Sequence, residues 1–282
     1  MPDSSALRAR ARPGSSLLAS ELQIMFSRWR HLAILGVLAA VPVLIALAVR
    51  FFDSPDSGQG PPFLDRVTQN GLFVGITALV ICVPLFLPLA VGVVAGDTVA
   101  GEAGQGTLRY LLLSPAGRTR LLAVKLAGVV VFCAAATLTV VVVGALIGLA
   151  LFGAQDVAVL SGGTITPWDS VGRALLAAGY VTLSLVGLAA VGLFISTLTD
   201  VPVGAMAATV TLAVVAQVLG QIPQIDWLHP WLLTYRWFDV ADVLRDPVAW
   251  ESFRLNALLQ AGYVVVFSAL AWARFTTKDV LS

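Results

Sequence analysis

Residues 101–125, GEAGQGTLRYLLLSPAGRTRLLAVK, form a short polar and basic segment between two long apolar runs. The flanking runs, residues 67–96 and 126–155, contain no Asp, Glu, Lys or Arg. A helix needs roughly 20 apolar residues to cross the hydrocarbon core of a bilayer, so each run can supply a membrane span. We therefore expect the segment to lie at a membrane surface, where it offers a partner something specific to bind.

The composition of the whole chain supports this interpretation. Of its 282 residues, 58% are hydrophobic and only 12% are charged, and the mean hydropathy is +0.91. Soluble domains carry about 25% charged residues, so the chain falls among integral membrane proteins. Its net charge of +1 provides no basic field that would recruit nucleic acid.

Six runs free of Asp, Glu, Lys and Arg cover residues 31–49, 67–96, 126–155, 174–199, 201–225 and 255–273. They lack the strict alternation of barrel strands, so they predict helices. The predicted fold is an all-α integral membrane protein with six transmembrane helices and an N-terminal interfacial amphipathic helix. The predicted parts are a mobile tail (1–14), the interfacial helix (15–30), the six-span domain (31–275) and a C-terminal tail (276–282).

The distribution of charge predicts the orientation. Eleven of the 17 Lys and Arg residues fall on the side that holds both termini, whereas ten of the 16 acidic residues fall on the other side. Positive charge marks the cytoplasmic side, so both termini are expected in the cytoplasm. Arg far outnumbers Lys, which together with the Ala content suggests a GC-rich bacterial source and hence the bacterial inner membrane.

The stretch before the first span has helical periodicity. Apolar residues recur on one face and polar residues on the other, as in a helix that lies in the membrane interface. The apolar face consists of Leu18, Leu22, Met25, Phe26 and Trp29. Two alternatives remain open: a helix packed on a neighbouring part of the protein, and a signal peptide that ends near residues 46–48.

Prolines mark positions where spans can bend. Pro42 lies in the first span, and Pro84 and Pro88 lie in the second. Because proline removes a backbone donor, these residues can shape a path or a hinge, or merely adjust packing. Gln217 is the amide that we single out within a predicted span, and we group it with these possible pathway or hinge residues.

The outer segment, residues 223–254, is too long for a plain turn. Trp237, Val240, Ala241 and Leu244 have the spacing of one face of an α-helix, and Asp246-Pro247 follows as a stop. We expect one or two helices here, lying at or dipping into the outer leaflet.

The sequence offers no catalytic, cofactor or metal site. Neither lysine, Lys125 or Lys278, ends a Gly-rich turn and precedes Ser or Thr, as a nucleotide-binding P-loop requires. The two cysteines, Cys82 and Cys133, lie in apolar runs without CxxC spacing, and the chain has only two histidines. Transport energised by this chain alone, or chemistry within it, is therefore not predicted.

The polar segment between the second and third spans is predicted to be a docking element within residues 97–122. Its glycines end the preceding helix, Thr107 can cap a new short helix, and Leu108, Leu111 and Leu112 give that helix an apolar face. Such a helix suits a groove on a partner protein. The alternative is a surface helix that rests on lipid headgroups.

The docking segment resembles the stretch between the second and third spans of type-2 ATP-binding-cassette exporter permeases. That family commonly has Glu, then Gly-Thr-Leu, a Leu pair, Pro, a basic residue and a Lys entering the next span. The matching residues here are Glu102, Gly106, Thr107, Leu108, Leu111, Leu112, Ser114, Pro115, Arg118 and Lys125, and Arg109 lies among them. Unlike many members, the chain has no further charge directly after Glu102.

The resemblance implies a transmembrane permease subunit without enzymatic activity of its own. It would pair with a second permease copy or a homologous permease and with two cytoplasmic ATPase subunits, which bind ATP and Mg. The expected activity is export of an apolar or amphipathic substrate such as a lipid, a drug-like compound or a peptide, with membrane lipids as further partners. The alternative is an ATP-independent membrane channel or scaffold.

Overall fold

A computed structural model describes residues 15–52, 71, 73–106, 117–153, 157–158 and 164–277. Within these residues, six helices are long and apolar enough to cross a membrane, and the chain is an all-α membrane protein, as the sequence predicts. Residues 1–14 and 278–282, where the sequence predicts tails, lie outside the described part of the chain.

The six long helices each extend over a predicted span. They are α2 (Trp29–Phe52), α5 (Phe86–Gly104), α7 (Arg118–Phe152), α8 (Pro167–Leu198), α9 (Pro202–Leu219) and α10 (Trp250–Thr277). The described residues also form two shorter apolar helices, α1 (Ser15–Ser27) and α4 (Phe73–Cys82), and two short 3₁₀-helices, η1 (Pro223–Trp231) and η2 (Trp237–Leu244). A strand pair of two residues each, β1 (Val157–Ala158) and β2 (Thr164–Ile165), lies between α7 and α8.

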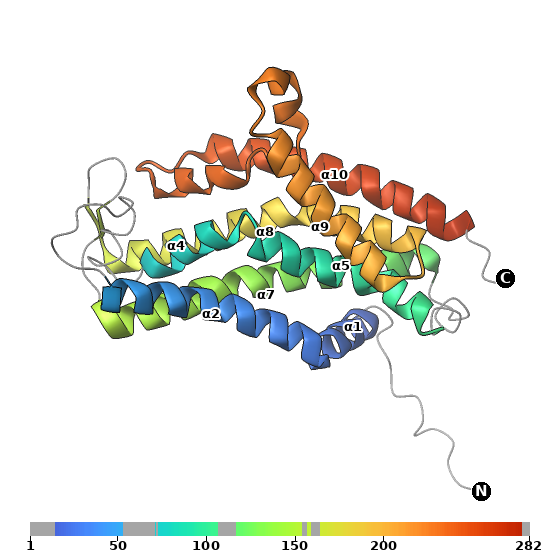
Figure 1. The fold of residues 1–282 in the computed structure, drawn as a ribbon, viewed down its shortest axis with the longest axis horizontal. Helices are drawn as coiled ribbons and strands as arrows, with labels where there is room; N and C mark the ends of the chain where they lie inside the picture. The colour runs from blue at the N-terminus through green and yellow to red at the C-terminus, as the bar shows by residue number, and fades with distance from the viewer. Residues whose placement is uncertain are drawn as a thin grey trace, which may run out of the picture.

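Helices α2, α5, α7, α8 and α10 run along one common direction, with α8 at the centre (Figure 1). Helix α8 packs against α10, α5 and α7, while α7 also packs against α2 and α4. Helix α9 crosses the bundle obliquely and packs mainly on α5. The end of α10 and helix α1 lie toward the same end of the bundle, which we call the α1 end.

Local sequence signals explain where several helices begin and end. The side-chain oxygen of Thr166 accepts a hydrogen bond from the backbone N–H of Asp169, and Pro167 occupies the first turn of α8. Pro202 begins α9 in the same way, directly after the short connection from α8. At the end of α5, Gly106 adopts a φ of 71°, a conformation that glycine tolerates without strain.

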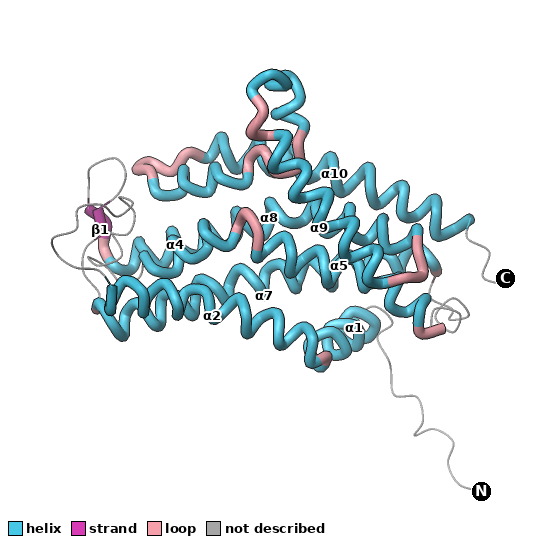
Figure 2. Tube along the Cα trace, in the orientation of Figure 1, coloured by secondary structure: helices cyan, strands magenta, loops and turns pink. Residues whose placement is uncertain are grey.

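The second predicted span is not one continuous helix. It is divided into α4 and α5 by a turn over residues 83–85, with Pro84 at its centre (Figure 2). The side-chain amide of Gln217 in α9 donates a hydrogen bond of 2.7 Å to the carbonyl oxygen of Pro84. Two of the residues grouped as possible hinge residues thus meet, because the interrupted helix leaves a carbonyl group that the amide can satisfy.

The other two prolines leave their helices intact. Pro42 lies inside α2, where a Cβ atom on Gly144 of α7 would come within 3.2 Å of its ring. Pro88 lies in the first turn of α5, where a missing N–H costs no intrahelical hydrogen bond. Both side chains are buried and serve packing.

Helix α7 approaches α4 and the residue Gly71 just before it through two glycine–glycine contacts. A Cβ atom on Gly144 would lie 2.5 Å from the Cα atom of Gly75, and one on Gly148 would lie 1.9 Å from the carbonyl oxygen of Gly71. On each side the two glycines are four residues apart, the spacing of a small-xxx-small motif, which lets membrane helices pack closely. Substitution at Gly144 or Gly75 must therefore push the two backbones apart.

The predicted helical face in the outer segment needs correction. Residues 237–244 form the 3₁₀-helix η2 rather than an α-helix, so the buried side chains recur every three residues, at Trp237, Val240 and Val243. Ala241, which α-helical spacing places on the buried face, is exposed. The expectation of one or two helices before the last span holds, with η1 and η2 in these places.

The interfacial helix is shorter than predicted. Helix α1 ends at Ser27, and Trp29 begins α2 with its side chain 80% exposed, so Trp29 does not belong to the packed face of α1. Met25 is buried, and Leu22 and Phe26 pack against the main hydrophobic cluster of the bundle. Leu18 is half-buried at the start of this face.

Candidate functional site

The predicted docking segment is described only at its two edges. Glu102 and Gly106 lie at the end of α5, and Arg118 begins α7. The remaining predicted docking residues, Thr107, Leu108, Arg109, Leu111, Leu112, Ser114 and Pro115, lie outside the described residues. The candidate site described below therefore consists of residues of α5 and α7, the helices that flank the segment, and of the helices that pack against them.

Arg118 connects the start of α7 to the end of α10. One nitrogen of its guanidinium group, Nη1, donates hydrogen bonds to the carbonyl oxygens of Phe275 at 3.2 Å and Thr276 at 2.8 Å. The last carbonyl groups of a helix have no intrahelical partner and carry partial negative charge, so a cation stabilises them. Trp272 adds a second connection by donating from its indole nitrogen to the Thr119 hydroxyl.

Lys125 lies about two turns further along α7 and is almost completely buried, with 1% of its side chain exposed. Its ammonium group lies 2.6 Å from Glu102 of α5 and 3.3 Å from Glu21 of α1. It also donates to the carbonyl oxygen of Thr98 at 3.1 Å. One cation thus joins three helices at the α1 end.

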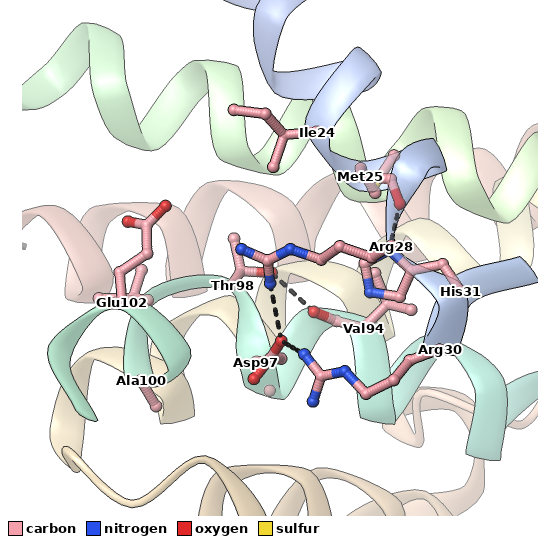
Figure 3. Close-up of polar contacts among 12 residues, drawn as sticks. Ile24, Met25, Arg28, Arg30, His31, Val94, Asp97, Thr98, Ala100 and Glu102 are labelled. Atoms are coloured by element: carbon pink, nitrogen blue, oxygen red, sulfur yellow. Dashed lines mark hydrogen bonds and ion pairs between the residues drawn. The ribbon is translucent and has the colours of Figure 1, made fainter. Parts of the chain in front are cut away.

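Asp97 forms a second ionic centre, more than one turn before Glu102 in α5. Its buried carboxylate accepts hydrogen bonds from Arg28 at 3.2 Å and from Arg30. In Figure 3 the two guanidinium groups converge on Asp97, whereas Glu102 points away from them. His31, next to this centre, shares a hydrogen bond of 2.7 Å between its Nδ1 atom and the carbonyl oxygen of Met25.

Ser196 of α8 inserts its hydroxyl group into the backbone of α5. The oxygen accepts hydrogen bonds from the N–H groups of Val99 and Ala100 at 2.9 and 2.8 Å, and it donates to the carbonyl oxygen of Gly96 at 2.8 Å. This serine fixes α5 to α8 between the two ionic centres. The α1 end of the bundle is accordingly held by polar contacts from α1, α2, α5, α7, α8 and α10.

A cavity of about 460 Å³ lies between α1, α5 and α7 at this end. Charged side chains from both ionic centres line it: Glu21, Arg28, Asp97, Glu102 and Lys125. Apolar side chains such as Leu17, Ile24, Leu121 and Val124 form the rest of its wall. A search for charge-free runs misses the cavity, because Asp97 and Lys125 lie just beyond the predicted runs yet inside the helices.

A second polar cluster lies between α8 and α10 and was also missed. Asn256 donates to the hydroxyl of Ser184 at 2.8 Å, and Gln260 donates to the carbonyl oxygen of Leu233 at 3.1 Å. Both amide side chains are buried within the sixth span. Their spacing of four residues on one helix face was a usable signal, but a search for Asp, Glu, Lys and Arg alone passes over amides.

Among the described residues, no group of three or more His, Cys, Asp and Glu side chains could hold a metal ion. Two buried serines of α8 have structural partners: Ser196 binds the α5 backbone, and Ser184 donates to the carbonyl oxygen of Tyr180. What the described site can do is hold helices together and present an amphipathic cavity at one membrane face.

The fold and this site define an all-α membrane protein with several spans and with buried ion pairs at the α1 end of its helices. The chain belongs to the DUF2705 family, described as "Protein of unknown function (DUF2705)", whose model matches residues 41–281. The match includes Asp97, Glu102 and Lys125 but begins within α2, after α1. A comparison with curated proteins found no match.

Proposed function

We propose that the chain is the transmembrane permease subunit of an ATP-binding-cassette exporter. In this proposal the segment between α5 and α7 docks on a cytoplasmic ATPase subunit, which binds ATP and Mg. A second permease, either a copy of this chain or a homologue, completes the transport unit. The protein then resides in the bacterial inner membrane with both termini in the cytoplasm, in agreement with the charge asymmetry of its loops.

The observation that carries this proposal is the buried contact between Lys125 and Glu102. These two residues flank the docking segment, one on each of the helices that enter and leave it, at a distance of 2.6 Å. A force applied to the segment therefore reaches α5 and α7 together. Glu21 extends the same connection to α1 at 3.3 Å, so three helices would respond as a unit.

The link to α10 supports the same proposal. Arg118 holds the last turn of α10 through two carbonyl groups, which adds the sixth span to the elements that the segment can move. Interfaces and packed cores shift between discrete arrangements rather than deforming continuously, so a small displacement at the docking segment can switch the whole bundle. The proposed substrate is apolar or amphipathic, because the charged side chains of this site lie at the α1 end and the six charge-free runs would line an uncharged path through the membrane.

The test is co-expression of the chain with an ATP-binding-cassette ATPase from the same organism. We expect Leu112→Asp and Thr107→Pro to reduce co-purification of the ATPase and to abolish any permease-dependent stimulation of its ATP hydrolysis in proteoliposomes. Thr277→Asp is the matched control because it adds the same charge at an exposed position at the α1 end of the bundle. It should co-purify as the wild type does.

Two outcomes contradict the proposal. One is normal co-purification and normal ATPase stimulation in both variants of the docking segment. The other is a chain that purifies alone and shows ion conductance in proteoliposomes without ATP, which is the behaviour of a channel.

A further inference from the structure

The cavity beside α1 has ends of different charge. At one end, two guanidinium groups, from Arg28 and Arg30, share the single carboxylate of Asp97. A guanidinium group has five N–H donors, and each of these two donates to Asp97 through one nitrogen, so donors remain for a further acceptor. Arg28 lines the cavity and its side chain is 33% exposed. This end of the cavity is therefore positive.

At the other end the charge is reversed. Glu21 also lines the cavity, and its carboxylate shares the Lys125 ammonium group with Glu102. The contact to Glu21 is the longer of the two, at 3.3 Å, and the Glu21 side chain is 27% exposed. A carboxylate has about four lone-pair sites, so Glu21 can accept hydrogen bonds from a ligand while it stays near Lys125.

The two cavity-facing charges come from α1 and from the residue that follows it. Glu21 lies in α1, whereas Arg28 lies in the bend between α1, which ends at Ser27, and α2, which begins at Trp29; both side chains line the cavity. Between them the wall of the cavity is apolar, with Ile24 and Met25 from α1 and Leu121 and Val124 from α7. The cavity thus combines a positive group, a negative group and an apolar wall.

The position of the cavity indicates where its ligand comes from. It lies at the α1 end of helices long enough to cross a bilayer, next to an exposed tryptophan, Trp29, of the kind that marks membrane interfaces. If the six helices cross a bilayer, this end reaches the level of the lipid headgroups of one leaflet.

We propose that this cavity binds the headgroup of a zwitterionic phospholipid that carries a primary ammonium group, namely phosphatidylethanolamine. The phosphate accepts hydrogen bonds from Arg28, the ammonium group donates to Glu21, and the first part of an acyl chain lies along Leu121 and Val124. This inference is independent of the proposed transport function, because it concerns a resident lipid rather than the transported substrate.

The charge pattern also selects against the other common headgroups. An anionic headgroup without an ammonium group, such as that of phosphatidylglycerol, could offer Glu21 only neutral hydroxyl donors. It would bring a net negative charge to the cavity with no positive charge to place opposite that carboxylate. A choline headgroup carries a positive charge but has no N–H group to donate. Hydrogen bonds to charged groups contribute about 1.5–3 kcal/mol, so the preference for the primary ammonium is expected to be roughly tenfold or more.

The experiment uses the purified full-length chain. It is equilibrated with vesicles of phosphatidylethanolamine, phosphatidylcholine and phosphatidylglycerol in equal amounts, isolated again, and its bound lipids are counted by native mass spectrometry. We expect one retained phosphatidylethanolamine per chain, in roughly tenfold excess over the other two lipids. Soluble glycerophosphoethanolamine, which lacks acyl chains, should not displace it at equal concentration.

Two variants locate the lipid. Arg28→Gln and Glu21→Gln should each reduce the preference by about tenfold, the loss expected for one charge-assisted hydrogen bond. Each leaves a counterion in place, because Arg30 still pairs with Asp97 and Glu102 still pairs with Lys125. Arg254→Gln and Glu251→Gln are matched controls that remove an exposed ion pair in the first turn of α10 and should change nothing.

The proposal is overturned by equal retention of the three lipids, by a preference for phosphatidylglycerol, or by displacement with the soluble headgroup. It is also overturned if both cavity variants keep the wild-type preference. If either variant fails to fold, as gel filtration would show, the lipid preference of the wild type still decides the question.

Discussion

Replacing Lys125 with Met tests whether the buried ion pairs hold the α1 end together. Methionine has nearly the same length as lysine but carries no charge, so Lys125→Met removes the ammonium group with little change in volume. Glu102, whose side chain is only 15% exposed, then loses the cation 2.6 Å away, and Glu21 loses the same partner. The helices α1, α5 and α7 are left with two carboxylates facing each other.

The expected loss of stability follows from the burial of the pair. Removing one partner of a buried ion pair costs about 3–5 kcal/mol, because the remaining charge is uncompensated. Both carboxylates are partly accessible to solvent, so we expect the lower end of this range. A loss of about 3 kcal/mol corresponds to a decrease of roughly 6–12 °C in the melting temperature.

The measurement is thermal unfolding of the purified protein in detergent, with two reference variants. Arg120→Met removes a positive charge from an exposed position in the first turn of α7 and should leave the melting temperature unchanged. The double variant Lys125→Met with Glu102→Gln removes both charges of the closest pair and should recover most of the loss, since neutral replacements of a buried pair are often tolerated. The reasoning is refuted if Lys125→Met unfolds at the same temperature as Arg120→Met, or if adding Glu102→Gln brings no recovery.

Two further predictions concern the packing of the spans. Gly144→Leu should lower the free energy of unfolding by ~3 kcal/mol or more, because a Cβ atom there meets the backbone of Gly75 at 2.5 Å. The control Gly179→Ala, in open space on α8, should be neutral or slightly stabilising. Equal stability of the two variants would contradict this prediction. Gln217→Leu should cost about 1–3 kcal/mol, because the Pro84 carbonyl loses its donor. Thermal unfolding measures this loss too, and a Gln217→Leu protein as stable as the wild type would show that the bond is dispensable.

The spans could be predicted from sequence because the bilayer imposes a strong requirement. Any helix that crosses the hydrocarbon core must be long and apolar, so the charge-free runs already give the number and order of the six spans. The helix ends could not be placed in the same way. Asp97 and Lys125 are charged yet buried, because each finds partners on other helices, and those partners are invisible to a search for apolar runs.

The division of the second span shows a different limit. Pro84 and Pro88 lie four residues apart, and either could have interrupted the helix. The interruption falls at Pro84 because Gln217, more than 100 residues later in the chain, supplies the donor that its carbonyl group needs. Sequence spacing identifies both prolines and the amide but cannot show which two will meet.

The candidate site was predictable only in part. The docking segment stands out through its polarity and its resemblance to exporter permeases, and its edges at Glu102 and Arg118 are placed at the ends of α5 and α7. The cavity beside α1 could not be predicted, because it needs Glu21 on α1 and Arg28 in the bend after it to face Lys125 on α7 and Asp97 on α5. Such an arrangement depends on how the helices pack together, and the spacing of residues along the sequence does not predict this packing.

Helix α9 packs on the bundle through small side chains. Its buried residues, which lie along one side of the helix, are Ala205, Thr209, Ala213 and Ala216. Among the described residues, the bond from Gln217 to the Pro84 carbonyl, in the turn between α4 and α5, is the only side-chain hydrogen bond from α9 to another element. Glycines of α5 lie directly opposite this helix: a Cβ atom on Gly96 would meet the backbone nitrogen of Met206 at 2.6 Å, and one on Gly92 would meet the side chain of Val210 at 2.7 Å. A lengthwise shift of α9 would carry Met206 and Val210 away from these glycines and against bulkier residues, so this contact holds α9 in register with α5.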